Sequence, residues 1–309
     1  MNIQDGIKKN CTPVIFDLQH FSVGDGPGVR TTVFFKGCNL HCPWCHNPES
    51  ISAGTQLMYE ESRCKNCGAC ISECPNGAHG TAEGRHVFDR KKCILCGNCV
   101  RNCPHEALRT AGKRISVSDI VQEVLQDEAF YRSSGGGVTL SGGEPLMQTD
   151  ACLSLLTELK RHSIHTLLDS ALAVPVPPEK LTEISRVTDC VYADVKSADE
   201  AYYRRAIGGD LQTVLHNIKL FRDRGVRVVL RLPMIPGINT AEVQLEAMAK
   251  LLKPLKLPVC PLAFHRMGAS KYRALGLQYT FENDESMPKQ KLLEIKKYFL
   301  SSGFELTDE

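Results

Sequence analysis

The stretch Cys38-Asn39-Leu40-His41-Cys42-Pro43-Trp44-Cys45 holds three cysteines in eight residues, spaced C-x3-C-x2-C. No fourth cysteine lies nearby, and a metal site that lacks one protein ligand is typical of catalysis rather than structure. Thiolates favour zinc, cuprous copper or iron–sulfur clusters. Three thiolates on a [4Fe–4S] cluster leave one iron free to bind a reacting molecule. We therefore predict a catalytic cluster on Cys38, Cys42 and Cys45.

Eight further cysteines form two copies of the pattern C-x2-C-x2-C-x3-C-P, with a repeat of 29 residues from Cys64 to Cys93. Two-cluster bacterial ferredoxins have this spacing, and in them the fourth cysteine of each run binds the other cluster. Paired zinc knuckles are the weaker alternative, because four cysteines crowded before a proline match them poorly. The sequence predicts one cluster on Cys64, Cys67, Cys70 and Cys103 and another on Cys93, Cys96, Cys99 and Cys74.

The composition limits the class of protein. A chain of 309 residues with 42% hydrophobic content can bury a full core, and a net charge of +2 gives no reason to expect nucleic acid or a membrane surface. Residues 1–9 lack an apolar signal segment, and no window is long and apolar enough for a membrane helix. We expect a cytoplasmic protein, in which fifteen cysteines require a metal or redox explanation. Cys152, Cys190 and Cys260 are predicted to be small buried hydrophobic residues, and Cys11 is left unassigned.

Strand and helix patterns alternate on both sides of the cysteine-rich segment. Strands are expected at 14–18, 32–36, 138–140, 165–168, 190–195, 226–232 and 259–264, with amphipathic helices between them and a short closing strand at 304–306. Such alternation predicts an α/β fold with a parallel sheet, and about six repeats suggest a partial (β/α)6 TIM-type barrel. Residues 1–52 and 113–309 would form the barrel. Residues 53–112 would form an inserted ferredoxin-like domain that two clusters stabilise.

Polar residues gather where the barrel strands are expected to end. They are Gly142, Gly143 and Glu144, then Asp169 and Ser170, Asp194 and Lys196, Arg231, and His265. Each has a structural explanation when taken alone: a turn for Gly142 and Gly143, an ion pair for Arg231 or for Asp194 with Lys196, and a buried histidine for His265. Because these five groups and the cysteine loop all fall at one end of one sheet, we favour a shared ligand site there.

Together these segments resemble the radical S-adenosylmethionine (SAM) enzymes, and among them the glycyl-radical-enzyme activating enzymes. The resemblance rests on C-x3-C-x-aromatic-C with Trp44 as the aromatic residue, and it covers nearly the whole chain. The other matching segments are Asp25-Gly-Pro-Gly-Val-Arg30, Phe34-Phe35-Lys36-Gly37-Cys38, Trp44-Cys45-His46-Asn47-Pro48, Thr139-Leu-Ser-Gly-Gly-Glu-Pro145, Asp194-Val-Lys196, Arg231-x-Pro-x-Ile-Pro-Gly237 and His265-x-Met-Gly-x-x-Lys-Tyr272.

The resemblance implies roles for single residues. The open iron of the Cys38, Cys42 and Cys45 cluster would bind the amino and carboxylate groups of SAM, with Gly142 and Gly143 at the amino group. Asp194, Lys196, Arg231 and His265 would contact the rest of SAM, beside Trp44 and Glu144. Asp169-Ser170 and Asp194 resemble the residues that hold a monovalent cation in the simpler pyruvate formate-lyase activating enzymes. Here serine replaces threonine, and Ala171-Leu172 stands where a glycine is usual, so the cation stays an open alternative.

The implied function is activation of a partner glycyl radical enzyme under anaerobic conditions. One electron, from a reduced flavodoxin or ferredoxin, would drive reductive cleavage of SAM to methionine and a 5′-deoxyadenosyl radical. That radical would take a hydrogen atom from a backbone glycine of the partner and end as 5′-deoxyadenosine. We expect a monomeric oxidoreductase with three [4Fe–4S] clusters. The alternatives are another radical SAM enzyme acting on a small molecule, and an electron-transfer iron–sulfur protein. The identity of the partner does not follow from the sequence.

Overall fold

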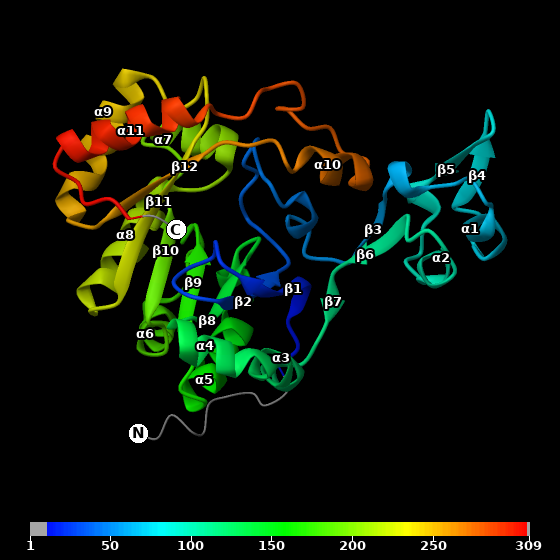
Figure 1. Ribbon diagram of the computed structural model, residues 1–309, viewed down its shortest axis with the longest axis horizontal. Coiled ribbons are helices and arrows are strands. Elements are labelled where there is room, and N and C mark those ends of the chain that lie inside the picture. The colour runs from blue at the N-terminus through cyan, green and yellow to red at the C-terminus, as the bar shows by residue number, and fades with distance from the viewer. Residues whose placement is uncertain (1–10, 308–309) are drawn as a thin grey trace.

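The computed structural model describes residues 11–307, so the prediction about a signal segment in residues 1–9 lies outside it. Its main feature is an eight-stranded sheet of order β12-β11-β10-β9-β8-β2-β1-β7 (Figure 1). The strands are β1 (Val14–Ser22), β2 (Arg30–Phe35), β7 (Lys113–Arg114), β8 (Gly137–Gly142), β9 (His165–Ser170), β10 (Cys190–Asp194), β11 (Arg227–Met234) and β12 (Val259–Ala263). The six strands from β2 to β12 are parallel, whereas β1 and β7 are antiparallel to their neighbours.

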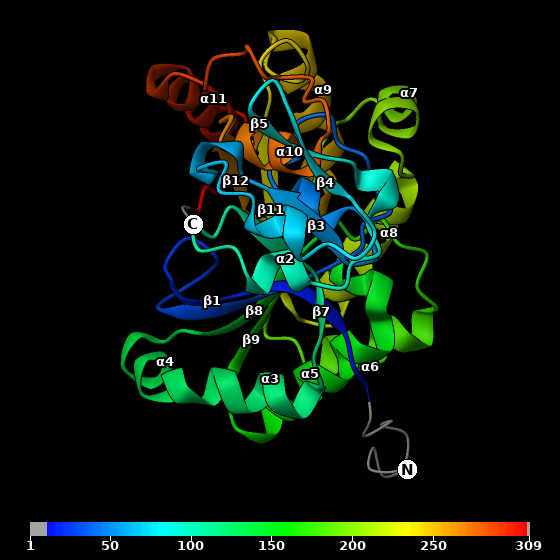
Figure 2. The same ribbon diagram turned by 90° about the vertical axis from the view of Figure 1, so that its right-hand side faces the viewer.

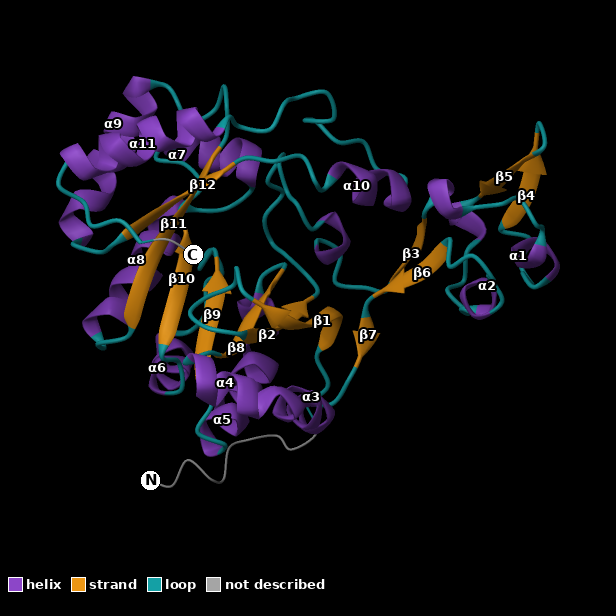
Figure 3. Ribbon diagram, viewed as in Figure 1, coloured by secondary structure: helices purple, strands orange, loops and turns teal. Residues whose placement is uncertain are grey.

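The helices outside residues 53–112 are α3 (Val117–Val124), α4 (Glu128–Ser134), α5 (Thr149–Arg161), α6 (Pro178–Arg186), α7 (Glu200–Tyr202), α8 (Leu211–Asp223), α9 (Glu242–Leu252), α10 (Ala269–Leu275) and α11 (Lys289–Ser301). Of these, α4, α5, α8 and α11 pack directly on strands of the sheet (Figure 3). Helix α3 begins at an N-cap, where the Ser116 hydroxyl accepts a hydrogen bond from the backbone N–H of Asp119 at 3.1 Å.

The alternation of side chains along the strands separates two apolar regions. On β10, Val191 and Ala193 belong to the large core against the helices, whereas Cys190 and Tyr192 pack on the other face with Leu167 of β9. Asp169 and Asp194 lie two residues beyond Leu167 and Tyr192, so they share that second face at its carboxyl end. Because side chains alternate along a strand, Asp169 and Asp194 point away from the core that the helices cover.

Residues 53–112 leave the sheet after β2 and form a separate lobe beside it (Figures 1 and 2). The lobe contains β3 (Gln56–Tyr59) paired with β6 (Leu108–Ala111), the hairpin of β4 (His79–Ala82) and β5 (Arg85–Phe88), and the short helices α1 (Ala69–Ser72) and α2 (Asn98–Arg101). Because β3 and β6 are antiparallel partners, the chain enters and leaves the lobe side by side.

The predicted repeat of 29 residues is visible in the backbone of this lobe. Gly68 and Gly97 precede α1 and α2 with φ of 79° and 77°, a left-handed conformation that glycine adopts without strain. The short 3-10 helices Glu61–Arg63 and Arg90–Lys92 occupy matching places before them. The two cysteine runs therefore have equivalent local folds.

Helix α10 connects the lobe to the sheet. Met58 and Ala111 of the lobe pack with Ala274 and Leu275 of α10, and Arg90 donates hydrogen bonds to the backbone carbonyls of Leu57 and Ala274 at 2.7 and 2.6 Å. One turn earlier, α10 carries Lys271, whose ammonium lies 2.7 Å from both Glu49 Oε1 and Asn47 Oδ1. The lobe and the end of the cysteine loop are thus fixed to the same helix.

Most expected elements are present, and two details differ from the expectation. The strand expected at 14–18 extends to Ser22 as β1 and pairs antiparallel with β2, outside the six parallel strands of the predicted barrel. The expected closing strand at 304–306 is one parallel bridge between Val259 and Leu306. Cys152, Cys190 and Cys260 are buried as predicted, and Cys11 is half-buried against the main core. Within residues 11–307, no helix has the length and apolar character needed to cross a membrane.

Candidate active site

The cysteine loop is held between the sheet and helical segments by its own backbone. The N–H groups of Gly37 and Cys38 donate to the carbonyls of Ser50 and Ile51 at 2.6 and 3.0 Å, and the N–H of His41 donates to Ile207 at 2.7 Å. Cys38, Cys42 and Cys45 then line one open cavity of about 590 Å³. This volume lies within the range of ordinary ligand pockets.

The structure brings twelve of the thirteen predicted residues of this site to that cavity, from six separate segments. They are Cys38, Cys42, Trp44, Cys45, Gly142, Gly143, Asp169, Ser170, Asp194, Lys196, Arg231 and His265. Glu144 is the exception, since it lies fully buried behind Ser170. Arg231 also departs from its expected place, because β11 continues to Met234. It reaches the cavity from within the strand, opposite Asp194.

Two acids and two bases form a connected network on the cavity wall. Lys196 Nζ lies 2.8 Å from Asp194 Oδ2, and Arg231 lies 3.5 Å from Asp169 and 4.0 Å from Asp194. Burial alone would lower the pKa of Lys196, but the Asp194 carboxylate raises it well above its usual value. Burial raises the pKa of Asp169 to about 6, although Arg231 acts against this. The cavity wall can therefore bind a ligand that carries both a positive and a negative charge.

Glu144 supports the site from below rather than lining it. Its carboxylate accepts hydrogen bonds from the Ser170 hydroxyl at 2.6 Å and from the backbone N–H groups of Ala171 and Leu146 at 3.0 and 3.1 Å. Burial raises its pKa to about 7, while these donors favour the charged form. Glu144 thereby ties the turn after β8 to the end of β9.

Gly142 and Gly143 are required by the close approach of two backbones. Gly142 has φ of 115°, and a Cβ atom there would lie 2.4 Å from the carbonyl oxygen of Phe35. A Cβ atom on Gly143 would lie equally close to the carbonyl oxygen of Gly37. Only glycine allows this turn to pack against the start of the cysteine loop.

Three further residues at the site were not predicted. The Ser141 hydroxyl donates to Asp169 at 2.6 Å, and His46 stacks on His265 with ring centroids 3.9 Å apart. Ser141 and His46 belong to sequence segments that resemble the activating enzymes, and that resemblance could have identified them. The Tyr203 hydroxyl is fully buried without a hydrogen-bond partner, on a π-helical segment (Tyr203–Ile207) that contacts the cysteine loop. No pattern in the sequence marks that segment.

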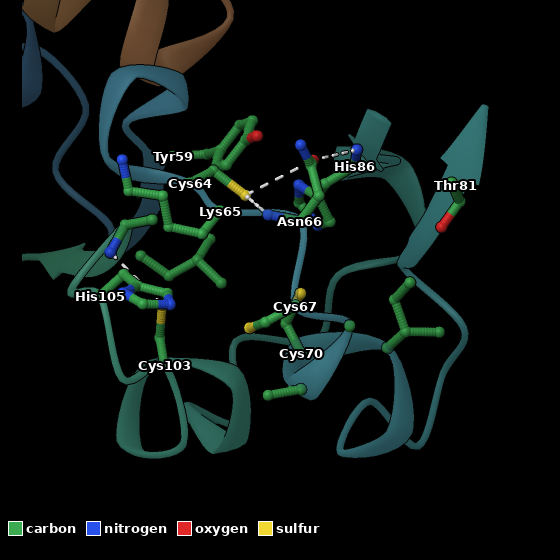
Figure 4. A pocket seen from close by; sticks show the side chains of 15 residues that line it. Tyr59, Cys64, Lys65, Asn66, Cys67, Cys70, Thr81, His86, Cys103 and His105 are labelled. Atoms are coloured by element: carbon green, nitrogen blue, oxygen red, sulfur yellow. Dashed lines mark hydrogen bonds between the residues drawn. The ribbon is translucent and has the colours of Figure 1, made fainter. Parts of the chain in front are cut away.

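The eight cysteines of the lobe divide between two small cavities. Cys64, Cys67, Cys70 and Cys103 line the first (Figure 4), and Cys74, Cys93, Cys96 and Cys99 line the second. Each cavity takes three cysteines from one run and one from the other, which is the grouping that the spacing suggests. Backbone N–H groups of Ala78 and Ala107 donate to the sulfurs of Cys74 and Cys103 at 3.2 and 3.3 Å, again in equivalent positions.

The cysteine sulfurs of the two sets are not gathered closely. Four thiolates around one zinc ion lie roughly 3.8 Å apart, because each Zn–S bond is about 2.3 Å. Among residues 11–307, the one group of three or more candidate ligand atoms within 4.8 Å of one another is Cys70, His79 and His86. No three sulfurs of either cysteine set are therefore that close together.

The comparisons with known proteins agree with this geometry. Residues 32–249 match the Radical SAM superfamily. Among curated relatives, the trans-4-hydroxy-L-proline dehydratase activating enzyme of Clostridioides difficile is 40% identical over 94% of this chain and 97% of that protein. The (2S)-3-sulfopropanediol sulfolyase activating enzyme of Bilophila wadsworthia (strain 3_1_6) is also 40% identical, over 94% of this chain and 99% of that protein.

A more distant relative is also named as an activating enzyme. The pyruvate formate-lyase 2-activating enzyme of Escherichia coli (strain K12) is 33% identical over 95% of this chain and 91% of that protein. The chain belongs to the radical SAM superfamily, and within it to the glycyl-radical-enzyme activating enzymes.

Proposed function

We propose that this chain activates a partner glycyl radical enzyme, using SAM bound at a [4Fe–4S] cluster on Cys38, Cys42 and Cys45. The observation that carries the proposal is the shared cavity, where three thiols face Gly142, Gly143 and a wall of paired charges. SAM contains a sulfonium cation, an amine and a carboxylate, and such a ligand suits a cavity that Asp194, Lys196 and Arg231 all line.

The cysteines present fit a metal cluster. Burial raises the pKa of the Cys38 thiol to about 12 and the pKa values of the Cys42 and Cys45 thiols to about 11, so three uncompensated thiolates would be costly there. A cationic iron cluster would remove that cost and displace the three protons. When bound, the cluster and SAM supply one-electron cleavage of the C5′–S bond and the radical that takes a hydrogen atom from glycine.

The protein's own residues position the cofactor and exclude water. Gly142 and Gly143 bring backbone groups close to the cysteine loop for the amino group of SAM. Lys196 and Arg231 supply positive charge and Asp194 and Asp169 supply negative charge, while Ser170 and Glu144 hold the connecting turn. Trp44 and His265 complete the lining. No proton transfer by a general base is needed in this assignment.

We assign the domains as in the sequence prediction. The six parallel strands and their helices would form a partial (β/α)6 barrel of residues 1–52 and 113–309. Residues 53–112 would form a ferredoxin-like insertion with two auxiliary [4Fe–4S] clusters, which the crossed cysteine sets of its two cavities support. Three clusters correspond to roughly twelve irons per chain.

Further assignments remain predictions. They are a cytoplasmic location, a monomeric state and a reduced flavodoxin or ferredoxin as electron donor. A monovalent cation between Asp169, Ser170 and Asp194 has less support, because Arg231 already lies between the two aspartates.

The test combines the reduced protein, SAM and purified glycyl radical enzymes of the kinds named in its relatives: trans-4-hydroxy-L-proline dehydratase, (2S)-3-sulfopropanediol sulfolyase and pyruvate formate-lyase 2. We expect a glycyl doublet in electron paramagnetic resonance with at least one of them. Cleavage of SAM without a doublet on any partner would favour a radical SAM enzyme for small molecules. Absence of 5′-deoxyadenosine and an iron content near eight would favour an electron-transfer protein.

A further inference from the structure

The cofactor cavity continues into an open groove that reaches the inserted lobe. A second cavity of about 730 Å³ shares Asn47, Arg231 and His265 with it. A third, of about 480 Å³, shares Arg109 and Lys271 with the second. We call the second and third cavities together the junction groove. It leads from the proposed reaction site, past the hairpin of β1 and β2, to the base of the lobe.

Large apolar side chains are exposed along both sides of this groove. Phe21 and Val23 at the tip of the hairpin are 54% and 74% exposed, and Met267, in the loop before α10, is 72% exposed. Phe21 has φ of 54°, an unusual conformation for a bulky residue, and its ring meets the exposed ring of Phe130 at 4.8 Å. Such a rim around an open groove indicates a surface that contacts another protein.

Arg109 shows that the lobe forms part of the groove. It lies on β6, lines both cavities of the junction groove, and forms an ion pair with Glu60 of the lobe at 3.1 Å. Lys271 of α10 lines the same two cavities from the other side. An insertion that only supplied electrons would not need a charged side chain in the path toward the reaction site.

We propose that the inserted lobe recognises the partner enzyme directly, with Arg109 forming one wall of the groove along which the partner's glycine-bearing loop enters. The inference rests on the proposed function, because hydrogen abstraction requires a glycine Cα in contact with the cofactor. An extended loop fits a groove that runs from the lobe to the reaction site. The guanidinium, with five donors, can bind the carbonyl or carboxylate groups of such a loop while keeping its contact with Glu60.

The experiment uses the partner, among the three enzymes named above, on which the wild-type protein forms a glycyl radical. In Arg109→Ala, we expect KM for that partner to rise about tenfold or more, because a hydrogen bond from a charged donor is lost. The maximal rate of radical formation, SAM cleavage without partner, and iron content should stay at wild-type values. Arg109→Lys should restore part of the affinity.

Arg85→Ala is the matched control, since Arg85 lies on β5 of the same lobe and lines none of the three cavities. Ser62→Trp provides a second variant, because Ser62 is exposed on the lobe's wall of the groove and a larger side chain there narrows it without removing an ion pair. It should raise the same KM.

A KM for Arg109→Ala and Ser62→Trp equal to that of Arg85→Ala would overturn the inference. The inference would also be overturned if Arg109→Ala slowed radical formation and partner-free SAM cleavage equally. That result would indicate that the lobe supplies electrons rather than binding the partner. The proposed function fails separately, if the wild-type protein forms no glycyl radical on any partner.

Discussion

Lys271→Met tests whether the cysteine loop depends on a buried charge pair with α10. Glu49 is 3% exposed in its side chain, and its Oε1 lies 2.7 Å from the ammonium of Lys271, which is 32% exposed. The variant leaves a buried carboxylate without its cation. At this separation the attraction is about 6 kcal/mol at an effective dielectric constant of 20, and desolvation of the two charged groups offsets part of it.

The size of the effect follows from removing one partner of a buried ion pair, which costs about 3 to 5 kcal/mol because the remaining charge is left uncompensated. Lys271 is partly exposed, so the lower end of that range applies. Loss of the hydrogen bond to Asn47 adds about 1 kcal/mol. We therefore expect the free energy of unfolding to fall by about 4 kcal/mol.

The assay is urea unfolding of the cluster-free protein at pH 7, followed by circular dichroism and by the fluorescence of Trp44. Trp44 is the chain's only tryptophan, and it lies in the cysteine loop. Adding Glu49→Gln to Lys271→Met should recover part of the lost stability, because no unpaired charge then remains buried. Lys291→Met, which breaks an exposed pair with Glu294, should cost less than about 1 kcal/mol. A deficit for Lys271→Met no larger than that for Lys291→Met would refute the reasoning.

Three further predictions concern the clusters and two buried polar groups. Cys38→Ala should abolish SAM cleavage and lower the iron content by about four, whereas Cys64→Ala should retain SAM cleavage with a strong artificial reductant. Iron analysis and assays of 5′-deoxyadenosine measure these effects. The reverse pattern would contradict the assignment of the catalytic cluster to Cys38. Tyr203→Phe should raise the free energy of unfolding of the cluster-free protein by about 1 kcal/mol, because the buried hydroxyl of Tyr203 has no hydrogen-bond partner. Urea unfolding measures this change. A loss of stability would show that the hydroxyl is hydrogen-bonded. Asp169 has a pKa of about 6 when folded against 3.8 ordinarily, so the folded state holds its proton more tightly and stability falls by up to about 3 kcal/mol as pH rises from about 4 to about 6. Asp169→Asn should flatten that part of the profile of unfolding free energy against pH, and an unchanged slope would exclude this group as its source.

The sequence predicted those features that depend on short segments. Cys38, Cys42 and Cys45 share one cavity because they are close along the chain, and Gly142 and Asp194 reach it because parallel strands place their carboxyl ends at the same edge. The family resemblance selected single residues within those segments. Family membership is shown by the comparisons, while the roles of these residues remain predictions.

Features that depend on pairing between distant segments were not predictable. The position of Arg231 between Asp169 and Asp194 results from the register of β10 and β11, in which Asp194 lies opposite Arg231. The antiparallel placement of β1 depends on its pairing with β2, and the residues of both strands would suit either direction. The buried Tyr203 hydroxyl belongs to a π-helical turn, for which the sequence has no recognisable pattern.

Helix α10 explains why the lobe contributes to the groove. One turn of this helix binds Glu49 and Asn47 after the cysteine loop through Lys271, and the next contacts Arg90 and Met58 of the lobe. Since both attachments are made to a helix of seven residues, the lobe cannot change its angle without moving α10 relative to the cysteine loop. The wall that carries Arg109 is therefore held at a defined place beside the reaction site. A recognition surface requires such a fixed position, whereas docking of a mobile electron donor alone does not.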